Sequence, residues 1–268
     1  MNLKPEEIFP LLALTSVKAG LEILAIRKSG FSVETKSDFS PVTLADQKAG
    51  SLIEKELKVT GIPVLSEEGK KIPYEVRSRW EKFWLVDPLD GTKEFIRGGN
   101  DFTVNISLIE NGNPVMGIVF VPETGLMYYA DPISGALKFR IGKEQYQQDV
   151  FPFSLAQGKR LPNRQASRPF TVVASRSHMN EPTRDYIDDL KKQHPDLDLI
   201  SAGSSLKFCL VAEGKADQYP RFGPTMEWDT GAGHAIVLGA GKKVIVPETG
   251  SPLKYNKENL LNPDFLVC

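Results

Sequence analysis

An apolar, strand-like run that ends in two closely spaced acids constrains this chain more than any other feature of its sequence. Residues 84–95 read WLVDPLDGTKEF. Pro88 fixes the turn that separates Asp87 from Asp90, because its ring restricts the backbone. We expect this turn to direct both carboxylates and the carbonyl of Leu89 toward one point. The fold must therefore end a buried strand at a site that tolerates two negative charges.

A bound cation is the economical explanation for such neighbouring carboxylates, because like charges otherwise repel. Mg2+ takes oxygen ligands and leaves several coordination positions to water and substrate phosphate. The alternative is a plain turn in which Asp87 and Asp90 cap backbone amides, as most Asp-Pro and Asp-Gly turns do. From these residues alone both interpretations stand.

Further acids follow or precede apolar segments elsewhere in the chain. Glu67 and Glu68 come after a short strand expected at 62–65, and Asp229 precedes the small residues TGAG at 230–233, which start a helix. Each feature has an ordinary alternative, a solvated pair for the glutamates and a helix N-cap for Asp229. Taken together, three acidic groups at the ends of apolar elements favour one converging metal site.

Thr92 follows Gly91 at the expected start of a short helix, where unpaired N–H groups and the helix dipole favour a phosphate. Its hydroxyl is also suited to orient a water molecule. Asp46 lies one turn into a helix that Thr43 can cap, so its ordinary role is a capping or surface carboxylate. The sequence alone does not place Asp46 beside Thr92.

Hydrophobic periodicity predicts two differently built halves. Helices are expected from Pro5 to before Gly30 and from Thr43 to before Gly61. The remaining first-half elements are strands at 62–65, 83–86 (ending at Asp87-Pro88), 102–108, 115–121, 126–130 and 137–141. In the second half, strands at 170–174, 197–200, 217–219 and 243–246 alternate with helices at 181–192, 204–213 and 229–238.

The polar, proline-containing stretch from 142 to 168 separates these halves. We therefore expect an N-terminal α+β domain over residues 1–160 and a C-terminal α/β domain over residues 161–268. Most of the candidate metal ligands lie in the first domain, and Asp229 lies in the second.

Composition excludes several classes of partner. The 33 Lys and Arg residues nearly balance 34 Asp and Glu residues, for a net charge of −1, which argues against a dedicated nucleic-acid binder. Two cysteines, Cys209 and Cys268, cannot form a disulfide framework, so a reducing, cytoplasmic setting is expected. The apolar stretch 11–26 is interrupted by Lys18 and Glu22, and we expect neither a transmembrane segment nor a signal peptide.

At this point the motifs resemble a known family. The sequence DPLDGT at 87–92, with Glu67-Glu68 before it and WDTGAG at 228–233 after it, is similar to the inositol monophosphatase superfamily of Mg2+-dependent, lithium-sensitive phosphatases. Three segments resemble, within that superfamily, the bacterial 3'(2'),5'-bisphosphate nucleotidases of the CysQ type: 87–95 (DPLDGTKEF), 203–208 (GSSLKF) and 219–229 (YPRFGPTMEWD). The similarity runs from the first helix to about Val246, with one small departure at Gly231, where relatives often have alanine.

The resemblance implies a layered α-β-α-β-α sandwich, an α/β (α+β) fold of the inositol monophosphatase and fructose-1,6-bisphosphatase type. It also implies hydrolysis of 3'-phosphoadenosine 5'-phosphate to AMP and phosphate, which clears a by-product of sulfate assimilation. The implied cofactor is Mg2+, as two or three ions, and the implied partner is this small nucleotide rather than a nucleic-acid polymer.

The resemblance also implies a role for each candidate residue. The implied metal ligands are Glu67, Asp87, the carbonyl of Leu89, Asp90 and Asp229. The implied catalytic residues are Asp46 and Thr92, which would orient and deprotonate the attacking water, and Glu67. The residues implied to contact the substrate are Glu67, Leu89, Asp90, Gly91, Thr92, Ser175, His178, Gly203, Lys207, Arg221 and Asp229.

Several alternatives stay open. Lys207 and Arg221 could be solvated charges, and a lone residue such as His178 is often a packed or surface histidine. A relative with the same metals could act on inositol 1-phosphate or fructose 1,6-bisphosphate, and a catalytically silent phosphate or nucleotide sensor could share the scaffold. The sequence also leaves open whether the chain is a monomer or a homodimer, and whether it associates peripherally with the inner membrane.

Overall fold

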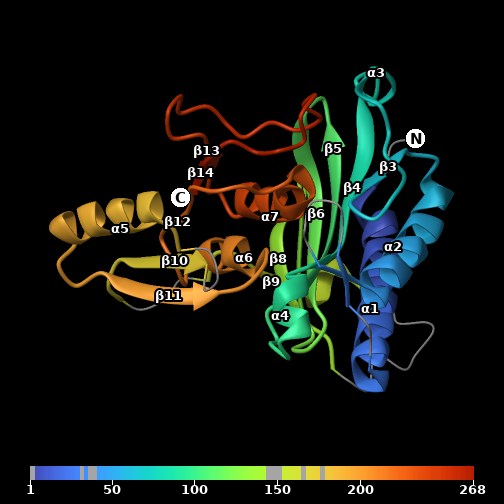
Figure 1. The fold of residues 1–268 in the computed structure, drawn as a ribbon, viewed down its shortest axis with the longest axis horizontal. Helices are drawn as coiled ribbons and strands as arrows, with labels where there is room; N and C mark the ends of the chain where they lie inside the picture. The colour runs from blue at the N-terminus through green and yellow to red at the C-terminus, as the bar shows by residue number, and fades with distance from the viewer. Residues whose placement is uncertain (1–3, 31–32, 36–40, 143–152, 164–166, 176–178) are drawn as a thin grey trace.

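The computed structural model of the chain is a stack of alternating helical and β layers (Figure 1). It describes residues 4–30, 33–35, 41–142, 153–163, 167–175 and 179–268. Helices α1 (Pro5–Ser29) and α2 (Leu44–Leu57) cover one face of a seven-stranded sheet. Helices α6 (Leu206–Ala212) and α7 (Glu227–Gly239) cover the other face, followed by short strands and then α5 (Glu181–Gln193). The predicted α-β-α-β-α sandwich is confirmed.

Both N-terminal helices form where their sequences carry start and stop signals. Pro5 occupies the first turn of α1, and Gly30 ends the helix with φ of +83°. Thr43 caps α2, and the side chain of Asp46 accepts from the Thr43 backbone in return, which makes a capping box. Both helices bury their apolar sides against the sheet, in a core that includes Trp84.

Helix α1 is also long and apolar enough to cross a membrane, by length and composition alone. This differs from the expectation that Lys18 and Glu22 exclude any such segment. Just over half of its apolar window, 56%, is buried inside the protein, where Phe9 and Leu12 are fully enclosed. The same length and composition are met by core helices, and the packing of α1 on α2 and the sheet accounts for its apolar side.

The large sheet has the strand order β3-β4-β5-β6-β7-β8-β9. Strands β3 and β4 pair in parallel, and every later pair is antiparallel, as the predicted meander requires. The bounds are β3 (Val64–Ser66), β4 (Lys82–Asp90), β5 (Thr103–Glu110), β6 (Asn113–Val121), β7 (Leu126–Asp131), β8 (Gly135–Arg140) and β9 (Lys159–Arg160). A separate pair, β1 (Val33–Thr35) and β2 (Pro41–Thr43), precedes α2, and short helical turns lie at η1 (Lys58–Thr60), α3 (Tyr74–Arg77) and η3 (Leu155–Gln157).

Strand β4 continues to Asp90, so the prediction that it stops at Asp87-Pro88 is wrong. The ladder with β5 pairs Asp87 with Asn105 and resumes at Asp90 opposite Thr103, with an irregularity between them. A proline cannot donate to the ladder, so it sits within this bulge. The bulge changes the direction of the Asp87 and Asp90 carboxylates. Helix α4 (Thr92–Ile96) starts directly after it.

The polar side of β5 is buried rather than exposed to solvent. Thr103, Asn105 and Ser107 are each at most 1% exposed, because α7 lies across this face of the sheet. A Cβ on Gly117 of β6 would come within 2.6 Å of a carbonyl of α7, so the glycine lets the helix approach. The polar side chains on this side of β5 can therefore form hydrogen bonds inside the protein.

The remaining strands belong to two smaller sheets. Strand β10 (Thr171–Ser175) pairs in parallel with β11 (Asp198–Ala202), as the alternating pattern predicts. Strand β14 (Phe265–Val267) lies between β12 (Tyr219–Arg221) and β13 (Val244–Ile245). The C-terminal strand was not predicted, because three residues carry too little periodicity to be recognised.

One apolar core draws on residues from both sides of position 160. It joins Phe83 and Val119 of the large sheet to Phe208, Ile236 and Phe265 of the later elements. The division into domains at 1–160 and 161–268 stays a prediction.

Gly231 allows α7 to lie close to the sheet. A Cβ at this position would lie 2.5 Å from Ser107 Oγ and 3.1 Å from Leu85 Cδ2. We predict that Gly231→Ala lowers the free energy of unfolding by about 1–3 kcal/mol, measured by urea denaturation, because the extra methyl overpacks this contact. Gly231→Ala should lower the free energy of unfolding clearly less when Ser107 has been replaced by alanine. An equal loss of unfolding free energy with and without Ser107→Ala would contradict this contact.

Candidate active site

Three carboxylates from three separate elements meet at one end of the large sheet. Glu67 follows β3, Asp87 lies in β4, and Asp229 lies in the first turn of α7. Each offers an oxygen, and these oxygens all lie within 4.8 Å of one another. The three groups converge as the sequence predicted, and this arrangement suits a hard divalent cation.

Burial and mutual repulsion raise the pKa of two acids in this cluster, Asp87 and Asp229. Removal from water raises the pKa of Asp87 well above its usual range, and the neighbouring charges of Glu67 and Asp90 add to the effect. Burial also raises the pKa of Asp229, with Asp90 and then Glu67 as the next contributors. A cation among these oxygens would offset both causes, because it favours the charged carboxylates.

Asp90 lies beside this cluster and is held by the start of α6. Its Oδ2 accepts hydrogen bonds from the backbone N–H of Ser205 at 2.6 Å and from Ser205 Oγ at 2.9 Å. The same hydroxyl lies 2.8 Å from the carbonyl oxygen of Asp229. Ser205 thus links two predicted metal ligands, although no role was predicted for it.

The sequence did offer a signal for Ser205, because it belongs to the GSSLKF segment that carries the family resemblance. A second signal is the polar side of β5. Asn105 Nδ2 donates to Ser205 Oγ at 2.9 Å, and Thr103 Oγ1 hydrogen-bonds with Asn105 Oδ1 at 2.9 Å. Buried polar residues at the start of β5 thus support the Asp90 carboxylate through Ser205.

Thr92 and Asp46 lie side by side, a contact that the sequence alone did not establish. Thr92 Oγ1 lies 3.1 Å from Asp46 Oδ1 and 3.2 Å from the carbonyl oxygen of Leu89. The other oxygen of Asp46 accepts from the backbone N–H of Thr43 at 2.7 Å and from its hydroxyl at 2.6 Å. The capping box therefore fixes Asp46, which leaves Oδ1 facing Thr92.

Two glycines keep the site open where backbones meet. Gly91 has φ of +93°, and a Cβ there would lie 3.1 Å from the carbonyl oxygen of Asp101. A Cβ on Gly203 would lie 2.7 Å from that same oxygen. The backbone N–H of Gly203 donates to Asp101 Oδ2 at 3.2 Å, so Asp101 joins the start of α4 to the loop before α6.

These groups line one cavity of about 280 Å³. Among the predicted residues, eleven line it: Glu67, Asp87, Leu89, Asp90, Gly91, Thr92, Ser175, Gly203, Lys207, Arg221 and Asp229. Asp46 lies behind Thr92, and His178 lies outside the described residues. The structure adds lining residues for which no role was predicted, namely Lys93, Glu94, Ser204, Phe208, Tyr219, Pro224, Thr225, Thr230 and Phe265.

The cavity has basic groups as well as acidic ones. Lys207 is buried, donates to the Ser204 carbonyl at 2.6 Å, and lies 5.3 Å from the centre of the Tyr219 ring. Arg221 donates to the Pro224 carbonyl at 2.8 Å. Carboxylates that suit cations and basic groups that suit anions therefore share one cavity, which fits a phosphorylated ligand bound together with a metal.

Comparison with known proteins shows the family of the chain. A model of the inositol monophosphatase family matches residues 5–264, nearly the whole chain. The chain belongs to the inositol monophosphatase family. This confirms the resemblance inferred from the motifs at 87–92 and 228–233.

Within the inositol monophosphatase family, the chain is similar to bacterial nucleotidases. The 3'(2'),5'-bisphosphate nucleotidase CysQ of Salmonella typhimurium is 47% identical over 235 residues, which cover 87% of each chain. The CysQ nucleotidase of Escherichia coli strain K12 is 44% identical over 238 residues, which cover 88% of each chain.

Two solved structures share the fold. The crystal structure of CysQ from Bacteroides thetaiotaomicron, a bacterial member of the inositol monophosphatase family, matches with a TM-score of 0.86 at 48% identity and covers 96% of each chain. The extragenic suppressor protein suhB of Bartonella henselae matches with a TM-score of 0.70 at 24% identity, over 91% of this chain and 88% of that one. The second match supports the fold alone.

Burial lowers the pKa of Lys207 from 10.5 to about 8, so the folded protein binds this proton less tightly than the unfolded chain does. Stability therefore rises with pH between about 8 and 10.5, where the unfolded state holds more protons. We predict that wild type gains roughly 2 kcal/mol of unfolding free energy relative to Lys207→Met between pH 7 and pH 10. Urea denaturation of both proteins across this pH range measures the difference. Parallel curves of unfolding free energy against pH for wild type and Lys207→Met would contradict the lowered pKa of Lys207.

Proposed function

We propose that this protein hydrolyses the 3'-phosphate of 3'-phosphoadenosine 5'-phosphate to AMP and phosphate with the help of Mg2+. The observation that carries the proposal is the convergence of Glu67, Asp87 and Asp229 in a cavity that also contains Lys207. The similarity to CysQ nucleotidases supports the choice of substrate. The proposal places the chain in sulfate assimilation or nucleotide recycling, in the cytoplasm.

The donor set fits Mg2+. Carboxylates and one backbone carbonyl are hard oxygen ligands. Burial, together with the neighbouring carboxylates, raises the pKa of Asp87 and Asp229, and a bound cation would favour their charged forms. When bound, Mg2+ lowers the pKa of a coordinated water and neutralises charge on the phosphoryl and leaving oxygens. In this proposal two or three ions are held by Glu67, Asp87, the Leu89 carbonyl, Asp90 and Asp229.

Thr92 and Asp46 are the residues proposed to activate the attacking water. Since Asp46 Oδ2 is occupied by Thr43, Oδ1 is the oxygen that accepts the Thr92 hydroxyl proton. When the Thr92 hydroxyl donates its hydrogen to Asp46, the lone pairs of Thr92 Oγ1 can accept a proton from the water. A proton leaving the water can therefore pass to Thr92 Oγ1 as the Thr92 proton passes to Asp46, and Glu67 is proposed to assist at the same water.

The remaining cavity residues are proposed to hold the substrate. The amides of Gly91 and Thr92 lie at the start of α4 and suit the scissile phosphate. Lys207 and Arg221 carry the positive charge expected to attract the second phosphate of a bisphosphate nucleotide. Ser175, His178 and Gly203 complete the proposed nucleotide contacts. Ser175 and Gly203 line the cavity, and His178 lies outside the described residues.

The substrate assignment is tested by measuring phosphate release from 3'-phosphoadenosine 5'-phosphate, inositol 1-phosphate and fructose 1,6-bisphosphate under identical Mg2+ concentrations. We expect the bisphosphate nucleotide to be preferred, activity to vanish on chelation, and millimolar Li+ to inhibit. A preference for either sugar-like substrate by about tenfold or more would overturn the specificity. No turnover of any substrate would favour a silent sensor.

Asp90→Asn tests the metal site itself. The substituted amide oxygen can still accept from Ser205, so we expect an unfolding free energy within about 1 kcal/mol of wild type but no turnover. Asp131→Asn is a matched control, because Asp131 caps the turn between β7 and β8 through the N–H groups of Ile133 and Ser134. Near wild-type turnover in Asp90→Asn would contradict the ligand assignment.

A further inference from the structure

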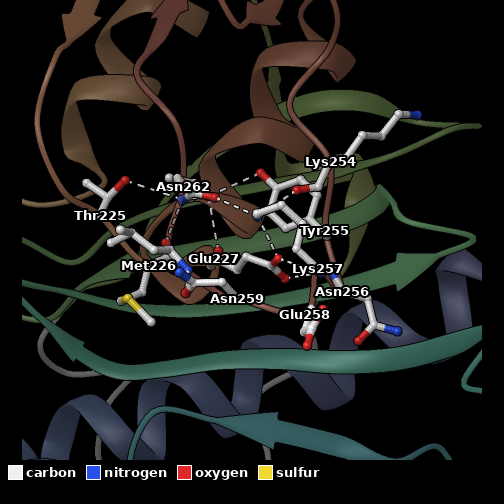
Figure 2. Close-up of polar contacts among 12 residues, drawn as sticks. Thr225, Met226, Glu227, Lys254, Tyr255, Asn256, Lys257, Glu258, Asn259 and Asn262 are labelled. Atoms are coloured by element: carbon white, nitrogen blue, oxygen red, sulfur yellow. Dashed lines mark hydrogen bonds and ion pairs between the residues drawn. The ribbon is translucent and has the colours of Figure 1, made fainter. Parts of the chain in front are cut away.

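A segment near the C-terminus, residues 254–262, lies against the first turn of α7 and makes a dense set of polar contacts with it (Figure 2). We call this segment the tail strap. No role was predicted for the tail strap from the sequence, and none of its residues is among the described residues that line the cavity. Its contacts nevertheless reach residues on both sides of Asp229.

The strap is joined to the residues that precede Asp229 by backbone and side-chain hydrogen bonds. The N–H of Asn262 donates to the Thr225 carbonyl at 2.8 Å, and the N–H of Glu227 donates to the Leu260 carbonyl at 3.0 Å. The Asn262 amide donates to the Met226 carbonyl at 2.8 Å, as Figure 2 shows. It also reaches Thr230 Oγ1 at 3.2 Å. The strap therefore holds the first turn of α7 before and after the metal-ligand position.

Glu227 is the second attachment point. Its carboxylate is fully buried and accepts from the backbone N–H groups of Asn256 at 2.6 Å and Lys257 at 2.9 Å. Lys257 Nζ completes the arrangement at 2.6 Å (Figure 2). These three donors hold the Glu227 carboxylate in position, because losing any one of them would leave buried negative charge without a hydrogen-bond partner.

The other end of the strap is tied to the first half of the chain. The buried guanidinium of Arg77 in α3 donates to Asn256 Oδ1 at 3.0 Å and to the carbonyls of Lys257 and Glu258, both at 2.6 Å. In return, Asn256 Nδ2 donates to the Arg77 carbonyl at 2.8 Å. Arg77 follows Glu67 by ten residues, so the strap joins the segment carrying one acid to the helix carrying another.

Met226 connects the strap to the site. Its carbonyl is held by Asn262, and its N–H donates to Asp229 Oδ2 at 2.8 Å. We propose that the tail strap positions Asp229 opposite Glu67 and Asp87 and thereby sets the affinity for the divalent cation, with Asn262 as the principal positioning residue. This inference rests on the proposed metal-dependent function. It assigns the strap a role in metal binding without contact to metal or substrate.

The test compares Asn262→Ala with Asn259→Ala in the full-length protein. Asn259 is exposed, and among the described residues its side chain caps the N–H of Leu261 alone, within the same strap, so it is a matched control. Mn2+ affinity is measured by electron paramagnetic resonance without substrate, and turnover is measured against Mg2+ concentration. For Asn262→Ala we expect metal affinity weakened on the order of tenfold, with turnover at saturating Mg2+ within about twofold of wild type. The control should match wild type in both.

Arg77→Lys provides a second variant if Asn262→Ala fails to fold, because it keeps the charge but not the forked contacts. It should weaken Mn2+ binding about threefold. Unchanged Mn2+ affinity in a folded Asn262→Ala or Arg77→Lys protein overturns the inference, as does an equal loss in Asn259→Ala. Wild type that binds no Mn2+ would instead refute the proposed function, so the two failures are distinguishable.

Discussion

The mutual repulsion of carboxylates brought together in one cavity is the interaction on which the arrangement of this site depends. Glu67, Asp87 and Asp229 come from three separate elements, and burial raises the pKa of two of them. Supporting contacts oppose this repulsion. Ser205 bridges Asp90 and the Asp229 backbone, and the tail strap holds the turn before Asp229. Structural donors thus hold the acids close, at a spacing that suits a cation.

Features carried by local chemistry were predictable from the sequence. Proline and glycine signals gave the limits of α1, alternation gave the meander, and the capping pattern gave the α2 start at Thr43. The convergence of Glu67, Asp87 and Asp229 was also predicted, because each acid terminates or begins an apolar element. The family resemblance supplied the link between Thr92 and Asp46, which local patterns could not provide.

Features that depend on distant partners were not predictable. Strand β4 passes through Pro88 because β5 offers a bulged register, which cannot be read from β4 alone. Strand β14 is three residues long and forms only because β12 and β13 flank it. The roles of Ser205 and Asn262 arise from contacts across 24 or more positions, to the Asp229 carbonyl and the Met226 carbonyl. Tertiary context decided each of these cases.

The most direct test of the central claim is anomalous diffraction from crystals of the protein soaked in Mn2+. The account predicts at least one anomalous peak within about 2.5 Å of carboxylate oxygens from Glu67, Asp87 and Asp229 together. A cavity with no peak, or a peak only at a different place in the protein, would contradict it.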